Sequence, residues 1–407
     1  MSVKLENFHN TGALLFGALI FLNLRPYFLW ENNIILLIVV FLVFFFTFAH
    51  LALFVRVPKK SGLLILLFLL SFFLNQITYQ RPIIWISVSI VAILCFLSMD
   101  EEVHYKTLKV FINIYALVSL PSILMFFFLA AGIDLEWEYL EPFSKVKQIQ
   151  GVFYREYPGM VILSTQIYSF STGELFRLSS VFAEPGVVGT VSALLLAATR
   201  FELKSWQGKL LLVSGILSFS LAFFVLSLLF LTLTRGFLLA VLASAAMLAL
   251  ALIPGDLRQN RIVDYYVIER LQNLFADTDK VNNRLNSCFE AQFAQYMKTS
   301  DAILGKGYKA SLMTECGVSS YKTVIYDYGI IGFLLFIAIY LLIFLQQTKG
   351  MAGQFKFIPF LIVCAASLYQ RPAFDHFWFF AIFLGSCTFI ASSNSDLHKK
   401  KDVDDGK

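Results

Sequence analysis

Long apolar stretches separated by short polar ones make up most of this chain. Many of these stretches approach or exceed the roughly 18 residues that cross the hydrocarbon core of a bilayer. They are uniformly apolar, whereas the strands of a membrane barrel alternate, so the pattern predicts helices rather than sheets. The apolar segments run over 11–30, 33–55, 61–79, 83–99, 107–131, 184–199, 209–231, 236–254, 318–345, 357–369 and 374–392.

Composition agrees with a protein that lies mostly in lipid. Of the 407 residues, 58% are hydrophobic and 14% are charged, against about 45–50% and about 25% in soluble domains. The first apolar stretch has no small-residue cleavage site and further spans follow it, so we expect it to be a span and not a removed signal. The expected fold is an all-α polytopic integral membrane protein with about 10–12 transmembrane helices.

Basic residues between the spans set the expected orientation. The positive-inside rule assigns basic clusters to the cytoplasm, which puts the N-terminus inside and two long loops, 132–183 and 255–317, outside. The formal net charge of +5 comes largely from loop residues, and no basic stripe indicates a nucleic-acid partner. The basic clusters are Arg56–Lys60, Arg200–Lys209, Lys349–Lys356 and Lys399–Lys401.

The same pattern divides the chain into regions, with one inconsistency. The segment 209–254 reads as two passes, whereas the expected sides of its flanking loops require an odd number. Either one element there is broken, re-entrant or interfacial, or one loop is on the other side. The expected regions are N-terminal transmembrane helices over 1–131, a first large loop over 132–183, central transmembrane helices over 184–254, a second large loop over 255–317, C-terminal transmembrane helices over 318–392 and a cytoplasmic tail over 393–407.

Cysteine and histidine spacing gives no indication of a metal site. The chain has no CxxC or HExxH motif, so neither a metal nor a cofactor is expected. Cys288 and Cys316 share the second large loop and could pair, although most such couples do not. The other cysteines lie in apolar stretches and are expected to behave as small hydrophobic residues: Cys95, Cys364 and Cys387.

A short polar stretch precedes the apolar segment 184–199. Pro185 suits the first turn of a helix, and Glu184 beside it faces the positive end of the helix dipole. A well-formed helix start explains both residues, but it does not explain Arg177 in the same short stretch. Because polar groups near the hydrocarbon are costly and often functional, Arg177 and Glu184 are candidate site residues.

Arg235 is the next unusual charge. It is the only charged residue between Lys209 and Asp256, and a charge at mid-membrane costs about 2.5–3.5 kcal/mol. A hairpin turn with a snorkelling arginine at its tip would explain it structurally. Lysine or serine would serve such a turn equally well, so a functional role is favoured.

Further candidates lie in the second large loop and the span after it. Arg270 is expected to be a solvated charge, whereas Arg284 is a candidate. Tyr321 and Asp327 follow at the start of the next span, where tyrosines are common but an aspartate is unusual. The guanidinium group of arginine can donate two parallel hydrogen bonds to phosphate oxygens. A carboxylate can take the proton of a sugar hydroxyl while the hydroxyl oxygen bonds to an anomeric carbon. The set therefore fits a lipid-diphosphate donor at the membrane surface.

Several of these motifs follow one another in a recognisable order. They are RLSSVFAEPGVVG at 177–189, LTLTRGFLLA at 231–240, NRLNSCFEAQFAQY at 283–296 with ILGKGY at 303–308, SSYKTVIYDYGIIGFLLF at 319–336 and FDHFWFFAIFLG at 374–385. In this order they resemble the O-antigen polymerase (Wzy-type) group of the O-antigen ligase/polymerase superfamily. The resemblance covers 177–392, and the first 176 residues match only in being apolar.

The resemblance implies an activity and roles for the candidates. Its members are multi-pass glycosyltransferases of the bacterial inner membrane, GT-C-like, that join oligosaccharide repeat units carried on undecaprenyl diphosphate at the periplasmic face. They need no nucleotide sugar or obligatory metal, and a flippase and a chain-length regulator are the expected partners. By this likeness Arg235 and Arg284 hold the diphosphate and Arg177 helps to place the donor. Glu184 or Asp327 orients or deprotonates the acceptor hydroxyl, and Tyr321 is a further substrate-binding candidate.

Two departures from the family bear on the alternatives. Ligases of the superfamily carry a histidine shortly before the span that begins near 318, and none of the five histidines lies there, which favours a polymerase. The family also has one more span between the Thr-Arg-Gly motif and the arginine loop, which leaves the membrane side of Arg235 open. A ligase remains the nearest alternative. A transporter of lipid-linked glycan should show paired halves, and the sequence has none. The product could be O-antigen of lipopolysaccharide, capsule or exopolysaccharide.

Overall fold

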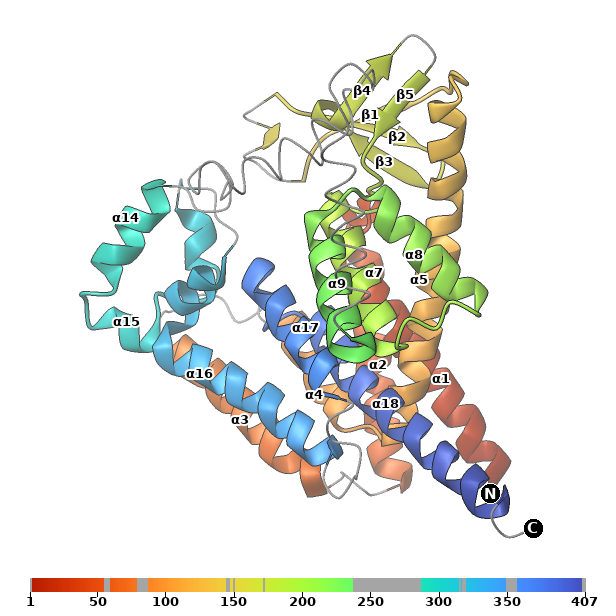
Figure 1. Ribbon diagram of the computed structural model, residues 1–407. Coiled ribbons are helices and arrows are strands. Elements are labelled where there is room, and N and C mark those ends of the chain that lie inside the picture. The colour runs from red at the N-terminus through yellow and green to blue at the C-terminus, as the bar shows by residue number, and fades with distance from the viewer. Residues whose placement is uncertain are drawn as a thin grey trace. The chain divides into compact units, whose positions relative to one another are not determined.

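The computed structural model describes residues 2–54, 59–78, 87–143, 147–148, 151–170, 173–236, 287–314, 316, 320–348 and 357–404 (Figure 1). The chain forms two compact units, one of residues 1–115 with 286–407 and one of residues 116–285. Within the described residues, three helices are long and apolar enough to cross a membrane, over Ile34–Leu53, Glu101–Ala130 and Tyr321–Thr348. Several shorter apolar helices accompany them. The expectation of a helical membrane protein is confirmed, and the number of spans stays a prediction.

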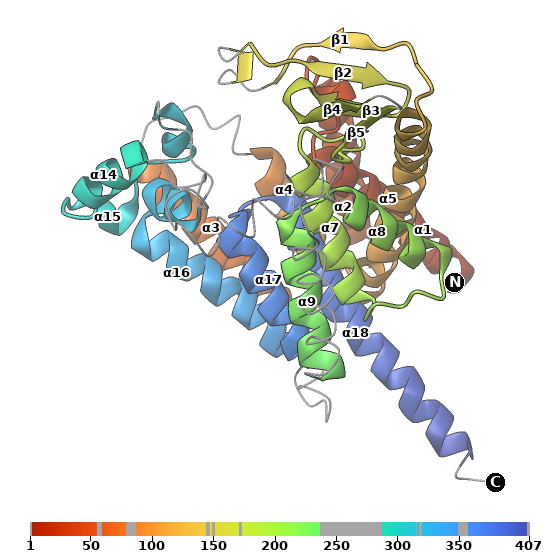
Figure 2. The ribbon, with the colours of Figure 1, turned by 45° about the horizontal axis from the view of Figure 1, so that its top comes forward.

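The first unit is a bundle of helices whose core is aromatic. Phe16 lies 5.0 Å from Phe96, and Phe377 lies 5.8 Å from Phe96, between ring centroids. Phe68 packs edge-on against Phe380, and α3 and α16 lie side by side in both views (Figures 1 and 2). The helices of this unit are α1 (Ser2–Asn23), α2 (Ile34–Phe54), α3 (Lys59–Thr78), α4 (Ser87–Leu97), the first half of α5 (Glu101–Ala130), α14 (Ser287–Tyr296), α15 (Asp301–Leu304), α16 (Tyr321–Thr348), α17 (Ile358–Gln370) and α18 (Phe377–Asp404), with short 3-10 turns η1 (Tyr27–Leu29) and η6 (Ala310–Met313).

The second unit combines helices with strands that the sequence analysis did not predict. The strands β1, β2 and β3 form an antiparallel sheet in that order, and β4 pairs with β5 as a hairpin. The expected first large loop is therefore folded, and the all-α description holds only outside it. The elements are the second half of α5, β1 (Glu138–Leu140), β2 (Tyr154–Tyr157), β3 (Met160–Leu163), the 3-10 turn η3 (Ser164–Gln166), β4 (Ile167–Phe170), β5 (Gly173–Phe176), α7 (Pro185–Ala198), α8 (Trp206–Leu217) and α9 (Leu221–Arg235).

The three-stranded sheet rests on the end of α5. Gly159, with φ +81°, makes the tight turn between β2 and β3, a backbone conformation that glycine adopts without cost. Its carbonyl accepts a hydrogen bond from Ser122 of α5 at 2.8 Å. Phe126 of α5 packs against Met160 and Phe176 in one buried cluster. This apolar contact explains why the segment folds instead of remaining an irregular loop.

Small residues bring α7, α8 and α9 close together. A Cβ atom at Gly189 of α7 would lie 2.4 Å from the side chain of Ser220, just before α9. The hydroxyl groups of Ser192 and Ser214 lie 3.3 Å apart between α7 and α8, as is typical of close helix contacts in membranes. Residues 218–220 separate α8 from α9, so the apolar segment expected over 209–231 is broken there. A broken element is one of the alternatives given above for the inconsistent number of membrane passes in 209–254.

Candidate functional site

Arg177 and Glu184 stand before α7, as expected, but each has a structural contact. The Arg177 side chain is buried, and its Nε donates a hydrogen bond to the carbonyl of Ser218 at 3.2 Å. It thereby ties the strand end to the turn between α8 and α9. Glu184 precedes Pro185 at the start of α7 without capping it through its side chain. Its Oε1 lies 3.5 Å from Nζ of Lys147.

Arg235 lies far from Arg177 within the second unit. It is the last residue of α9 and is exposed. Because Arg177 contacts Ser218 just before this 15-residue helix, a rise of about 1.5 Å per residue separates the two arginines by about 22 Å. The structure therefore does not bring Arg177 and Arg235 together. Arg284 lies outside the described residues.

Asp327 and Tyr321 belong to the first unit, in α16. Both carboxylate oxygens of Asp327 accept hydrogen bonds from Ser311, at 2.7 Å from its backbone N–H and at 2.9 Å from its hydroxyl. Asp327 is buried and holds the loop after α15 in place. The ring of Tyr321 stacks on Tyr369 of α17 at 5.5 Å between centroids.

The loop after α15 meets a break in α16 backbone to backbone. Gly329 interrupts the helix with φ 71° and ψ 176°, a combination that only glycine adopts readily. A Cβ atom on Gly305 would lie 2.4 Å from the Asp327 carbonyl oxygen, and one on Gly329 would lie 2.5 Å from the Gly305 nitrogen. Two hydrogen bonds join the segments, from Lys306 N–H to the Tyr326 carbonyl at 2.8 Å and from Gly307 N–H to the Asp327 carbonyl at 2.9 Å.

This contact sets Tyr308 beside Tyr328, with 6.4 Å between their ring centroids, and further polar residues lie near them. The Tyr328 hydroxyl donates to Oδ2 of Asp375 at 2.8 Å, and Nε2 of His376 lies 3.8 Å from Oδ1 of the same carboxylate. The charge of Arg25, which follows α1, acts on Tyr308, Lys309 and His376. We call Arg25, Tyr308, Lys309, Tyr328, Asp375 and His376 the polar cluster. Its members come from four regions of the sequence.

The polar cluster combines charges of both signs. Burial lowers the pKa of Lys309, and the nearby charge of Arg25 lowers it further. Burial also raises the pKa of Tyr308. Arg25 and Lys309 both have left-handed backbones, with φ of 55° and 56°, which costs about 1–3 kcal/mol at each non-glycine residue. The carboxylates of Asp375 and Asp327 act on Lys309 and Tyr308 with the sign opposite to that of Arg25, so two cations and two carboxylates lie near one another there.

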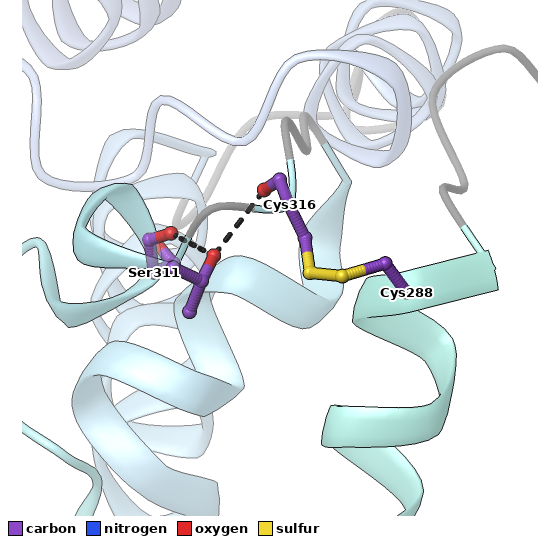
Figure 3. The surroundings of a disulfide bond; sticks show 4 residues. Cys288, Ser311 and Cys316 are labelled. Atoms are coloured by element: carbon purple, nitrogen blue, oxygen red, sulfur yellow. Dashed lines mark hydrogen bonds between the residues drawn. A yellow bond between two sulfur atoms is a disulfide. The ribbon is translucent and has the colours of Figure 1, made fainter.

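A disulfide fastens the loop that carries Tyr308 and Lys309. Cys288 of α14 is bonded to Cys316, so the couple left open by the sequence does pair (Figure 3). The Thr314 hydroxyl lies 2.6 Å from the Ser311 carbonyl and 3.2 Å from the Cys316 carbonyl. The cross-link thus continues through the loop to Ser311, which binds Asp327.

We expect removal of this disulfide to destabilise the protein. Cys288→Ser or Cys316→Ser should cost about 2–4 kcal/mol, because the open loop gains freedom in the unfolded chain. The measurement is the thermal unfolding midpoint of the purified protein in detergent, with and without a reducing agent. A reductant should lower the midpoint of the wild type and leave that of Cys288→Ser unchanged. A wild-type midpoint that is insensitive to reductant would contradict this expectation, and Cys95→Ala, a buried free cysteine, is the control.

An apolar cavity lies in the same unit as the polar cluster. It has a volume of about 360 Å³ and lies among α16, α17 and α18. Phe374 lines it and is followed in the chain by Asp375 of the cluster. The Phe374 carbonyl accepts a hydrogen bond from Tyr340, another lining residue, at 2.9 Å. One step along the chain therefore leads from the lining of the cavity, at Phe374, to the polar cluster, at Asp375.

The sequence analysis proposed none of the residues of the polar cluster as a site residue. Arg25 interrupts the apolar segment 11–30, and that charge was the available signal. Asp375 and His376 lie within the last motif of the resemblance, but without an assigned role. His376 now stands near the 319–336 motif, so the missing histidine no longer favours a polymerase over a ligase. Among the described residues, no group of three or more His, Cys, Asp or Glu is arranged to hold a metal ion.

Comparison of the chain with protein-family models, with curated proteins and with solved structures finds no match. The function is therefore argued from the polar cluster, the cavity and the motifs that meet there. The segments 303–308, 319–336 and 374–385 were separate stretches of the resemblance, and all three contribute to this one site.

Proposed function

We propose that the protein polymerises oligosaccharide repeat units carried on undecaprenyl diphosphate into a surface polysaccharide at the outer face of a bacterial inner membrane. The observation that carries this proposal is a polar cluster with two cations in the same unit as an apolar cavity, the two being joined in the chain at Phe374 and Asp375. A lipid-linked glycan has an apolar chain, a diphosphate and a sugar in that order. The cavity suits the first, and Arg25 and Lys309 suit the second.

The chemistry of the two cations supports a diphosphate ligand. Arginine presents parallel N–H groups that match phosphate oxygens, and lysine adds a compact charge. In glycosyl transfer the diphosphate leaves with an additional negative charge, so cations at that position stabilise the transition state. No metal is needed for this step. Arg235 and Arg284 remain candidates for the second lipid diphosphate, because polymerisation requires a growing chain as well as an incoming unit.

The expected orientation supports activity at the outer face. The polar cluster gathers the end of α1, the start of α16 and the turn between α17 and α18. By the positive-inside rule the basic runs Lys349–Lys356, after the other end of α16, and Lys399–Lys401, near the other end of α18, face the cytoplasm. A donor delivered by a flippase would meet the cluster on the opposite side.

Two alternatives use the same groups. An O-antigen ligase would transfer the finished glycan to another acceptor, and His376 gives that reaction a candidate histidine. A transporter of lipid-linked glycan would bind the diphosphate without breaking a bond. The convergence of three stretches of the resemblance on one site favours glycosyl transfer, and the acceptor separates the polymerase from the ligase.

Deletion of the gene tests the proposal. Surface glycan from the deletion strain should run on a gel as single repeat units, and the wild-type gene should restore the ladder of longer chains. Persistence of full-length chains in the deletion strain would rule out polymerisation. Loss of all surface glycan would indicate transport, and accumulation of long chains on the lipid carrier would indicate ligation.

A further inference from the structure

The turn between α17 and α18 carries a carboxylate with a defined orientation. Tyr328 donates to Oδ2 of Asp375 at 2.8 Å, which fixes one oxygen. Oδ1 faces Nε2 of His376 at 3.8 Å, which is too long for a hydrogen bond. A hydroxyl oxygen about 2.8 Å from both atoms fits between them in a triangular arrangement. The pair therefore has the spacing to receive a sugar hydroxyl.

Access to this carboxylate differs from that of Asp327. The Asp375 side chain is 19% exposed and that of His376 is 47% exposed, so a ligand can approach from that side. Asp327 is buried, with both oxygens accepting hydrogen bonds from Ser311. Asp327 therefore positions the loop, and it is not suited to the role of base that the sequence suggested.

The groups around Asp375 come from every element packed against it. They are Tyr328 and Asp327 of α16, Tyr308 and Lys309 of the loop before it, Arg25 after α1, and Arg371 and His376 of its own turn. A diphosphate bound by Arg25 and Lys309 would bring its sugar into the same cluster as this carboxylate. An in-line displacement needs the acceptor hydroxyl to attack the anomeric carbon from the side opposite the leaving diphosphate, and Asp375 would hold the acceptor on that side.

We propose that Asp375 is the general base of the glycosyl transfer and that Tyr328 and His376 position it and the acceptor. The inference rests on the proposed function. Asp375 takes the proton of the acceptor hydroxyl, whose oxygen forms a bond to the anomeric carbon of the donor. The bond from that carbon to the diphosphate oxygen breaks, and its electron pair leaves with the lipid diphosphate. The proton then passes to water.

The test uses the purified full-length protein in lipid vesicles with lipid-linked oligosaccharides extracted from the deletion strain. Asp375→Asn should lower kcat by about 100-fold or more with KM nearly unchanged, since a general base contributes roughly 100- to 10,000-fold. Asp375→Glu keeps a carboxylate and should retain part of the rate. Asp134→Asn, on an exposed loop, should be as fast as the wild type.

Positioning and catalysis are separated by further readouts. Tyr328→Phe and His376→Asn should each lower kcat by about 10-fold with KM nearly unchanged. The thermal midpoint of each variant reports whether it folds, and Asp375→Glu serves where Asp375→Asn does not. If the wild type makes polymer and Asp375→Asn makes it equally fast, Asp375 is not the general base, and the proposed function still stands. A wild type that makes no polymer from the same lipids would overturn the proposed function and the base together.

Discussion

Replacing Arg25 by glycine is expected to slow chain growth strongly without straining the backbone. Its φ of 55° is left-handed, so glycine fits this position at least as well as arginine does. The variant loses charge-assisted hydrogen bonds to the diphosphate, each worth about 1.5–3 kcal/mol, and kcat/KM should fall by about 10- to 150-fold. Lys309 has φ 56°, and Lys309→Gly should lower kcat/KM by a similar factor. The double variant should make no detectable polymer.

Arg25→Lys and Lys298→Ala provide the matched controls. Arg25→Lys keeps the charge but loses the two-pronged contact, so its kcat/KM should lie between those of the wild type and Arg25→Gly. Lys298 is an exposed lysine near α15, and its replacement should change nothing. The measurement is the rate of polymer formation from extracted lipid-linked oligosaccharide, with the thermal midpoint as a check on folding. Equal rates for Arg25→Gly and the wild type would contradict binding of the diphosphate by this cluster.

The helical membrane architecture could be predicted because lipid imposes it on the sequence directly. Uniform apolar segments such as 107–131 and 318–345 correspond to the long helices α5 and α16, since every buried peptide group must be paired within its own segment. The strands β1 to β5 were missed because they lie in a polar region without that constraint. They form only where the end of α5 gives them an apolar surface to cover.

Separation along the chain explains which contacts around the candidate site the sequence could indicate. Asp327 and the Gly-Lys-Gly turn at 305–307 lie close together in sequence, and the structure brings them into contact. Asp375 is 47 residues from Tyr328, and Arg25 lies near the other end of the chain. Their meeting depends on tertiary packing of α1, α16 and α18, which sequence spacing does not encode.

The structure separates the two arginines of the second unit for a local reason. The segment 209–231 reads as one uninterrupted apolar run in the sequence. The turn at 218–220 divides that run into α8 and α9, and it binds Arg177 at the start of α9. Ser218 and Ser220 are weak turn signals within an apolar stretch, and they were the available indication of the break.

The largest effect on stability is expected for Gly329→Ala. A Cβ atom there would lie 2.4 Å from the Ile303 carbonyl oxygen and 2.5 Å from the Gly305 nitrogen. Both neighbours are backbone atoms that the disulfide and Ser311 hold in place, so they cannot move aside cheaply. With the added strain of φ 71°, the variant should lose about 3 kcal/mol or more. Its thermal midpoint should fall by roughly 6–12 °C.

Loss of the contact between Gly305 and Gly329 should also abolish activity at the site. This contact aligns Tyr308 with Tyr328, so Gly329→Ala should abolish polymer formation. Gly62→Ala is the control, because a Cβ atom on Gly62 of α3 meets nothing within 4 Å, and alanine in a helix is neutral or mildly stabilising. Gly305→Ala breaks the same contact from the other side. The double variant should therefore lose much less than the sum of the two single losses, and additive losses would mean that the two glycines act independently.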